Sequence, residues 1–187
     1  MSKSIFTQKA LAETFKSLLL EMPLEKISVK DIATRCGISR NAYYYYYKDK
    51  FELMWWIVEY EMSEIVKVYD SSYIISDAYA AICDHFYDNR KFYYACLQYQ
   101  GQNSLYEYLT EFLHELTKMK LLEQCVNEKL PFQDIPLDVY SRMLSGGMVE
   151  AIRMWYADGF RDNYKTFLKP VQEYINLQHR IYVQENR

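Results

Sequence analysis

Glycine and proline are scarce in this sequence, with five glycines and four prolines among 187 residues. Average usage of the two together is roughly 12% of a chain, so this chain has few positions at which the backbone can turn sharply. Sandwiches and barrels of β-strands need a turn about every ten residues, and the scarcity argues against them. We therefore expect an all-α protein built from a few long helices.

Long apolar runs and targeting signals are also missing. No run approaches the roughly 18 residues that a membrane span needs, and the N-terminal residues MSKSIFTQKA lack the apolar centre and cleavage site of a signal peptide. Disorder is excluded as well, because half of the residues are hydrophobic and 17% are aromatic. We expect a folded cytoplasmic protein with no membrane partner.

Cysteine and histidine are few and follow no metal-binding pattern. The four cysteines form no C-x-x-C pair, which argues against a disulfide framework or a zinc knuckle. Cys83, His85, Cys96 and His114 have the atom types that a soft metal prefers. However, Cys83 and His85 are two positions apart on a predicted helix, so they do not share a face. We expect no metal site.

Signatures of catalysis are absent too. The sequence contains no Gly-rich phosphate loop, no G-x-S-x-G, no H-E-x-x-H and no paired-carboxylate motif. Asp84-His85 and His114-Glu115 are isolated pairs. We expect that the protein is not an enzyme and uses no cofactor.

Charge is distributed unevenly along the chain. Residues 1–50 contain nine Lys/Arg and five Asp/Glu, which gives +4, whereas the remaining 137 residues contain 13 and 20, which gives −7. A small basic module joined to a larger acidic body is typical of a nucleic-acid reader with a separate regulatory domain.

The N-terminal pattern predicts a helix-turn-helix. Residues 7–22 place apolar side chains at helical spacing, and a proline follows. Ser28 and Asp31 resemble a capping box that opens a short second helix, and Gly37 ends it. Ser39 can cap a third helix, which runs through the tyrosines that follow. Two short helices joined by a tight turn form this motif.

The rest of the chain reads as helical. Apolar residues from Phe51 to Val66 mark one face of a long fourth helix, and Ser71–Ser72 breaks it. We expect Pro131 and Pro136 to bracket a loop. The further helices are expected at about 76–88, 90–99, 105–127 and 137–159, with a last one that starts or kinks at Pro170.

Residues 28–53, SVKDIATRCGISRNAYYYYYKDKFEL, closely resemble the DNA-binding signature of the TetR/AcrR family of bacterial transcriptional regulators. The resemblance implies a three-helix DNA-binding domain in residues 1–50 and a larger helical effector and dimerisation domain in residues 51–187. It also implies a homodimer built largely from the last long helices. The features at the family's spacing are Ile32-Ala33, Gly37-Ile38-Ser39, Tyr43-Tyr44, Tyr47, Lys48-Asp49-Lys50 and Leu53.

The third helix has two sides with different expected roles. Tyr43 and Tyr47 are four apart and are expected to fill the core. The opposite side can present base-reading groups to a major groove, although a solvated arginine and asparagine would look the same in sequence. The resemblance to the family implies that the hydroxyl of Tyr44 contacts a DNA phosphate. The predicted DNA contacts are Ser28, Lys30, Arg40, Asn41, Tyr44, Tyr45, Tyr46 and Lys50, of which Ser28, Lys30 and Lys50 have ordinary capping or solvated roles as their alternative.

The tyrosine run departs from the family pattern, which often has histidine or another polar residue at Tyr46 and varies at Tyr45. Tyrosine offers a donor, an acceptor and an apolar ring face to a base. The base preference is therefore not transferable from the family, and neither the operator nor the choice between repression and activation can be read from these positions.

Residues 87–109 and 144–159 resemble the C-terminal domain of a TetR subfamily that includes the activator of dihydroxyacetone kinase operons. In that activator the signal arrives through a protein that resembles a dihydroxyacetone kinase subunit. The resemblance thus puts a protein coactivator beside a small-molecule effector as the signal. A metal-responsive regulator is the least favoured alternative.

Two adjacent glycines interrupt the last long helix. Each costs about 0.5–1 kcal/mol relative to alanine inside a helix. Close approach of a second copy across a dimer interface would offset that cost, and an intramolecular kink is the alternative. The predicted dimer interface is Leu144, Gly146, Gly147, Met148, Ile152 and Trp155.

Overall fold

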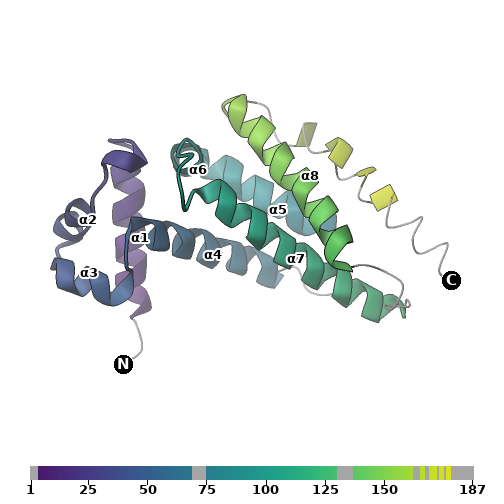
Figure 1. The fold of residues 1–187 in the computed structure, drawn as a ribbon, viewed down its shortest axis with the longest axis horizontal. Coiled ribbons are helices and arrows are strands. Elements are labelled where there is room, and N and C mark those ends of the chain that lie inside the picture. Colours follow the sequence, from purple (N-terminus) through teal and green to yellow (C-terminus); the bar gives the residue numbers. More distant parts are fainter. Residues whose placement is uncertain are drawn as a thin grey trace. The chain divides into compact units, whose positions relative to one another are not determined.

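The computed structural model describes residues 4–68, 75–129 and 137–161, together with parts of 165–177. All regular elements in these ranges are helices, which confirms the all-α prediction. None of the described helices is both long and apolar enough to traverse a bilayer. The elements, coloured along the chain in Figure 1, are α1 (Ile5–Leu19), the 3₁₀ turn η1 (Leu24–Lys26), α2 (Val29–Cys36), α3 (Arg40–Tyr46), α4 (Lys50–Val68), α5 (Ile75–Asp88), α6 (Arg90–Leu97), α7 (Leu105–Glu128) and α8 (Leu137–Ala157).

The predicted helices differ from the observed ones mainly at their ends. The first helix ends at Leu19 rather than at residue 22, because the amides of Glu21 and Met22 both bond to the carbonyl of Leu18 in a closing turn. The turn η1 was not predicted. The expected break at Ser71–Ser72 and the expected proline loop at 131–136 lie outside the described residues.

The predicted capping residues lie at the start and end of α2 and at the start of α3. Ser28 and Asp31 form a reciprocal capping box at the start of α2, and Gly37 ends it in the left-handed conformation with φ 72°. The side chain of Ser39 accepts a hydrogen bond from the amide of Ala42 at the start of α3. These caps satisfy backbone groups that a helix of two turns leaves without intrahelical partners.

The chain divides into two compact units. The first comprises the residues up to Met62 together with Arg90–Leu105, and the second comprises Ser63–Asn89 and the residues from Tyr106 onward. The first unit thus contains α1, α2, α3, most of α4 and all of α6. It extends beyond the DNA-binding domain expected at residues 1–50, a functional boundary that stays a prediction.

The first unit packs α1 against α2, α3 and α4. Gln8 of α1 donates to the hydroxyl of Tyr47 at 3.2 Å. On the same helix, Lys16 forms an ion pair with Glu61 of α4, which also accepts a hydrogen bond of 3.0 Å from Tyr93 of α6. The largest side chains of its core include Leu11, Phe15, Leu18, Ile32, Tyr43 and Leu53, each at most 2% exposed.

The second unit packs α5, α7 and α8 together. Tyr79 of α5 is hydrogen-bonded to Thr117 of α7, and the ring of Tyr87 stacks on Trp155 of α8 with centroids 6.2 Å apart. Lys118 of α7 pairs with Asp138 of α8 at 3.1 Å. Each of the three helices therefore contacts both of the others through side chains.

Candidate nucleic-acid interface and dimer face

The helix α3 has a buried side and an exposed side. Tyr43 and Tyr47 are 0% and 3% exposed, which confirms their predicted place in the core. Arg40 and Asn41 are exposed, as are Tyr44 and Tyr45 at 47% and 49%. We call the four exposed side chains of this helix the α3 row (Arg40, Asn41, Tyr44 and Tyr45).

Hydrogen bonds and ring contacts fix how the α3 row is presented. The hydroxyl of Tyr43 donates to the carbonyl of Asp49 at 2.9 Å, and its ring meets that of Tyr44 edge-on at 5.9 Å. Burial raises the pKa of both Tyr43 and Tyr47 well above the ordinary value, so their hydroxyls stay protonated. The α3 row therefore lies on a helix whose buried side is uncharged and packed in the core.

Tyr46 occupies an intermediate position. It is only half-exposed, and its ring packs edge-on against Tyr45 with centroids 5.1 Å apart. It also lies 6.4 Å from the ring of Tyr47. These contacts favour a supporting role for Tyr46 beside the more exposed Tyr45.

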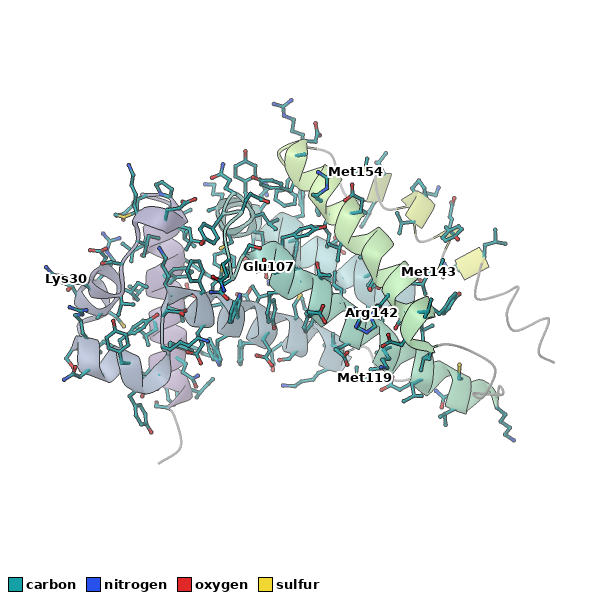
Figure 2. All side chains as sticks on the ribbon, viewed as in Figure 1. Lys30, Glu107, Met119, Arg142, Met143 and Met154 are labelled. Carbon is teal, nitrogen blue, oxygen red and sulfur yellow. The ribbon has the colours of Figure 1, made fainter. Side chains whose placement is uncertain are left out.

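At the start of α2, Ser28 is occupied by capping. Its hydroxyl donates to Asp31 Oδ2 at 2.6 Å and accepts from the Asp31 amide at 3.2 Å. The Ser28 hydroxyl, together with the Ser28 amide that donates to the same oxygen at 2.9 Å, holds the pKa of the Asp31 carboxyl below its usual range. Since a serine has one hydroxyl proton, the geometry favours the capping alternative for Ser28. Lys30, exposed on α2 in Figure 2, stays available for a phosphate.

Lys50 lies in a different environment from the one that the sequence suggested. Its Nζ donates to the carbonyl oxygens of Leu24, Glu25 and Ile27 at 2.6, 3.1 and 2.8 Å. Burial lowers the pKa of this ammonium below its usual range. The geometry therefore favours a structural bond to η1 over the predicted phosphate contact.

Lys48 was not among the predicted DNA contacts, although it belongs to the Lys48-Asp49-Lys50 run. This side chain is exposed two residues after α3, and its Nζ lies 5.7 Å from the ring centre of Trp55. The signal that could have found it is the position of a lysine directly beyond the tyrosine run. Arg35, by contrast, is committed to a bidentate pair with Glu21 at 2.6 and 2.8 Å.

These groups suit DNA in chemical terms. A guanidinium can bind guanine in the major groove, an amide can pair with adenine, and phenols can bind phosphate or contact thymine. The first residues of a recognition helix are the ones that reach base edges, and Arg40 and Asn41 are the first two residues of α3. The arrangement can therefore read bases at the start of α3 and hold phosphates from its flanks.

The predicted dimer residues divide between two sides of α8. Leu144, Met148, Ile152 and Trp155 are at most 7% exposed and lie in the core of the second unit. Gly146 and Gly147 are exposed. At about 100° per residue, the four apolar positions lie about 165° from Gly146 and about 95° from Gly147. The interface role of these six residues stays a prediction.

The exposed side of α8 carries three apolar side chains, and the charged Glu150 lies among them. Val139, Met143 and Met154 are 55%, 69% and 52% exposed, and Figure 2 labels the two methionines along the helix. A Cβ at either glycine would meet no atom within 4 Å. The described part of the chain therefore gives no steric reason for glycine at these two positions. We call Val139, Met143, Gly146, Gly147 and Met154 the α8 face.

The thiols and imidazoles form no metal site in the parts of the chain that the structure describes. No group of three His, Cys, Asp or Glu residues there is arranged to hold an ion. Cys83 and Cys96 are fully buried and belong to different units, and burial raises the pKa of both thiols. His85 lies beside Asn89, the residue that follows α5.

A family comparison identifies the C-terminal part of the chain. Residues 75–177, more than half of the sequence, match the TetR-type family described as "Transcriptional regulator C-terminal region". Over 66 residues the chain is 39% identical to the HTH-type dhaKLM operon transcriptional activator DhaS of Lactococcus lactis subsp. lactis (strain IL1403). That match spans 35% of this chain and 35% of the relative's length.

Solved structures share the fold over nearly the whole chain. The dihydroxyacetone kinase operon activator DhaS matches with a TM-score of 0.75 and 20% identity, over 96% of this chain and 99% of its own. The fatty acid degradation regulator FadR from Bacillus halodurans matches with a TM-score of 0.66 and 16% identity, over 94% and 96%. At these identities the likeness establishes the fold.

Proposed function

This chain belongs to the TetR family of transcriptional regulators, and from that premise we propose that it works in the cytoplasm as a homodimer that binds a two-fold DNA operator. The α3 row carries the proposal, because four exposed polar and aromatic side chains stand on a helix whose other side is anchored by buried tyrosines. Each copy would place one α3 in the major groove.

In the proposed complex each side chain has a distinct task. Arg40 and Asn41 read base edges, since they lead α3 and carry bidentate groups. The hydroxyl of Tyr44 and the ammonium of Lys30 hold phosphates on either side, which fixes the register without reading sequence. Two such helices in a dimer require half-sites about one helical turn apart or slightly more.

The α8 face supports the homodimer. Its methionines and valine expose apolar surface, and two glycines in mid-helix leave room for a second backbone to approach. Their cost to an isolated helix is about 1 kcal/mol each. A self-complementary contact around a two-fold axis would offset that cost, because each copy contributes the same face.

We expect Met143→Glu combined with Met154→Glu to convert the dimer to a monomer. Both side chains are more than half exposed, so the folded monomer tolerates the change, whereas a carboxylate buried at an interface is strongly unfavourable. Analytical ultracentrifugation over a range of concentrations measures the mass. Leu20→Glu, a matched change at an exposed leucine of the first unit, should leave it unchanged.

Two results would count against this face. A double variant that keeps the dimer mass would move the interface elsewhere on the chain. A wild-type protein that is monomeric at all concentrations would contradict the homodimer itself.

The second unit is the proposed receiver of the signal. An effector that binds it controls DNA affinity only if it binds one of two conformations better than the other, and the difference limits the response. We infer that the response is a change in the spacing or mobility of the two α3 helices. The effector is a small molecule or a partner protein.

A protein coactivator is the second candidate signal, favoured by the 39% identity to the Lactococcus activator of the dhaKLM operon. In that case a purified dihydroxyacetone-kinase-like subunit should co-elute with the chain in gel filtration and raise its DNA affinity. A subunit that elutes separately and leaves DNA affinity unchanged would leave a small molecule as the effector.

Fluorescence anisotropy tests the DNA-binding function directly. The protein is titrated against duplexes from the intergenic region upstream of its own gene, beside a scrambled duplex, at two salt concentrations. Selective and strongly salt-dependent binding would support a sequence-specific regulator. Equal and weak binding to both duplexes would mean that the operator lies outside this region or that DNA binding requires a coactivator.

A further inference from the structure

The first residue of α4, Lys50, is bound to the turn that leads into α2. Its Nζ lies 2.6 Å from the carbonyl oxygen of Leu24, 3.1 Å from that of Glu25 and 2.8 Å from that of Ile27. An ammonium group has three N–H donors and no acceptor, so these carbonyls occupy all of them. Ser28, the N-cap of α2, directly follows the last of the three.

The neighbouring residue holds α3 in a similar way. The carbonyl of Asp49 accepts the hydroxyl of Tyr43 from the buried side of α3 at 2.9 Å. Its carboxylate caps α4 by accepting the amide of Glu52 at 2.8 Å. One corner of the chain, residues 49 and 50, is therefore hydrogen-bonded to α3 and to the turn that leads into α2.

We propose that Lys50 is a positioning residue for operator binding, which holds the start of α2 in place relative to α3 and does not itself neutralise a phosphate. The proposal rests on the proposed DNA-binding function and assigns Lys50 a task within it. Lys30, the second residue of α2, would then be the lysine that binds a phosphate, and Lys50 would fix the helix that carries it.

The two possible tasks respond differently to arginine. A guanidinium binds phosphate at least as well as an ammonium does, so a phosphate contact survives Lys50→Arg. Three carbonyls that converge on one nitrogen suit a compact ammonium, and a planar guanidinium has a different shape and length. A positioning role thus predicts that arginine fails almost as badly as methionine, which keeps an apolar stem and has no donor.

The test combines hydrogen exchange without DNA and affinity with DNA. The variants are Lys50→Arg and Lys50→Met. Lys48→Arg and Lys48→Met are the controls, at an exposed lysine two residues earlier in the chain. Both Lys50 variants should speed amide exchange about tenfold in peptides covering residues 24–32, with peptides of the second unit unchanged. The Lys48 variants should leave exchange in residues 24–32 as in the wild type.

Affinity is measured for a duplex that the wild-type protein selects from a random-sequence pool. Both Lys50 variants should bind this duplex at least about tenfold more weakly, because the start of α2 is no longer held in place. Wild-type affinity in Lys50→Arg would overturn the proposal and restore the phosphate contact, and so would unchanged exchange in both variants. If the wild type selects no duplex, the DNA-binding function fails, while the exchange result still decides whether Lys50 holds α2.

Discussion

Trp155→Ala is expected to lower the free energy of unfolding by about 3–5 kcal/mol, the usual cost of removing a large buried aromatic side chain. Trp155 is 1% exposed and fills the space between two other rings. It stacks on Tyr87 at 6.2 Å and meets Phe160 edge-on at 4.7 Å. Its removal leaves a cavity that these rings can close only in part. Urea unfolding followed by circular dichroism measures the loss.

The next residue along α8 supplies the control. Met154 is 52% exposed on the α8 face, so Met154→Ala should leave the stability of the monomer within about 0.5 kcal/mol. The loss in Trp155→Ala should also be the same at all protein concentrations, since it arises within one chain. A loss that appears only on dilution would instead place Trp155 at the interface between copies, as the sequence had suggested.

The sequence predicted the helix-turn-helix well because its determinants are local. Ser28 with Asp31, Gly37 and Ser39 act within one or two turns of where they stand, and all three caps are present in the structure. The sides of α3 follow from periodicity in the same way, since Tyr43 and Tyr47 are four residues apart. Signals of this kind require no knowledge of tertiary packing.

Other features were beyond the sequence because they depend on distant segments. The hydrogen bonds from Lys50 to the carbonyls of Leu24 and Ile27 join residues more than 20 positions apart. From the sequence alone, a lysine beside a DNA-binding motif is predicted to contact a phosphate. The apolar residues of α8 and its two glycines were predicted to belong to one dimer interface. Only the packing of α8 on α5 shows which side is core.

If the proposed signal is received by the second unit, the helix α4 provides a covalent route from that unit to the first. The helix α4 contributes its residues up to Met62 to the first unit and the rest to the second. The same α4 begins at Lys50, which holds the start of α2. A change in the second unit that alters α4 would therefore reach the α2 start through covalent continuity and three hydrogen bonds.

Arg40→Ala combined with Tyr44→Phe is expected to abolish most of the specific DNA binding without unfolding the protein. A bidentate contact to a base contributes about 1–3 kcal/mol, and a dimer loses it twice, so the specific affinity should fall by about 2–6 kcal/mol, or about 30-fold to 10⁴-fold. Both side chains are exposed, so circular dichroism and thermal unfolding should stay as in the wild type. Anisotropy titration measures the affinity.

Two matched variants separate base reading from charge. Arg153→Ala removes the same charge from an exposed arginine of the second unit, one that pairs with Glu150, and should leave DNA affinity nearly unchanged. Lys30→Met should weaken binding to operator and scrambled duplexes alike and reduce the salt slope, because a phosphate contact carries no sequence information. Arg40→Ala should instead reduce the preference for operator over scrambled DNA.

If the double variant keeps the wild-type affinity and preference, the α3 row is not the contact surface, and base reading must be assigned to other residues of the first unit.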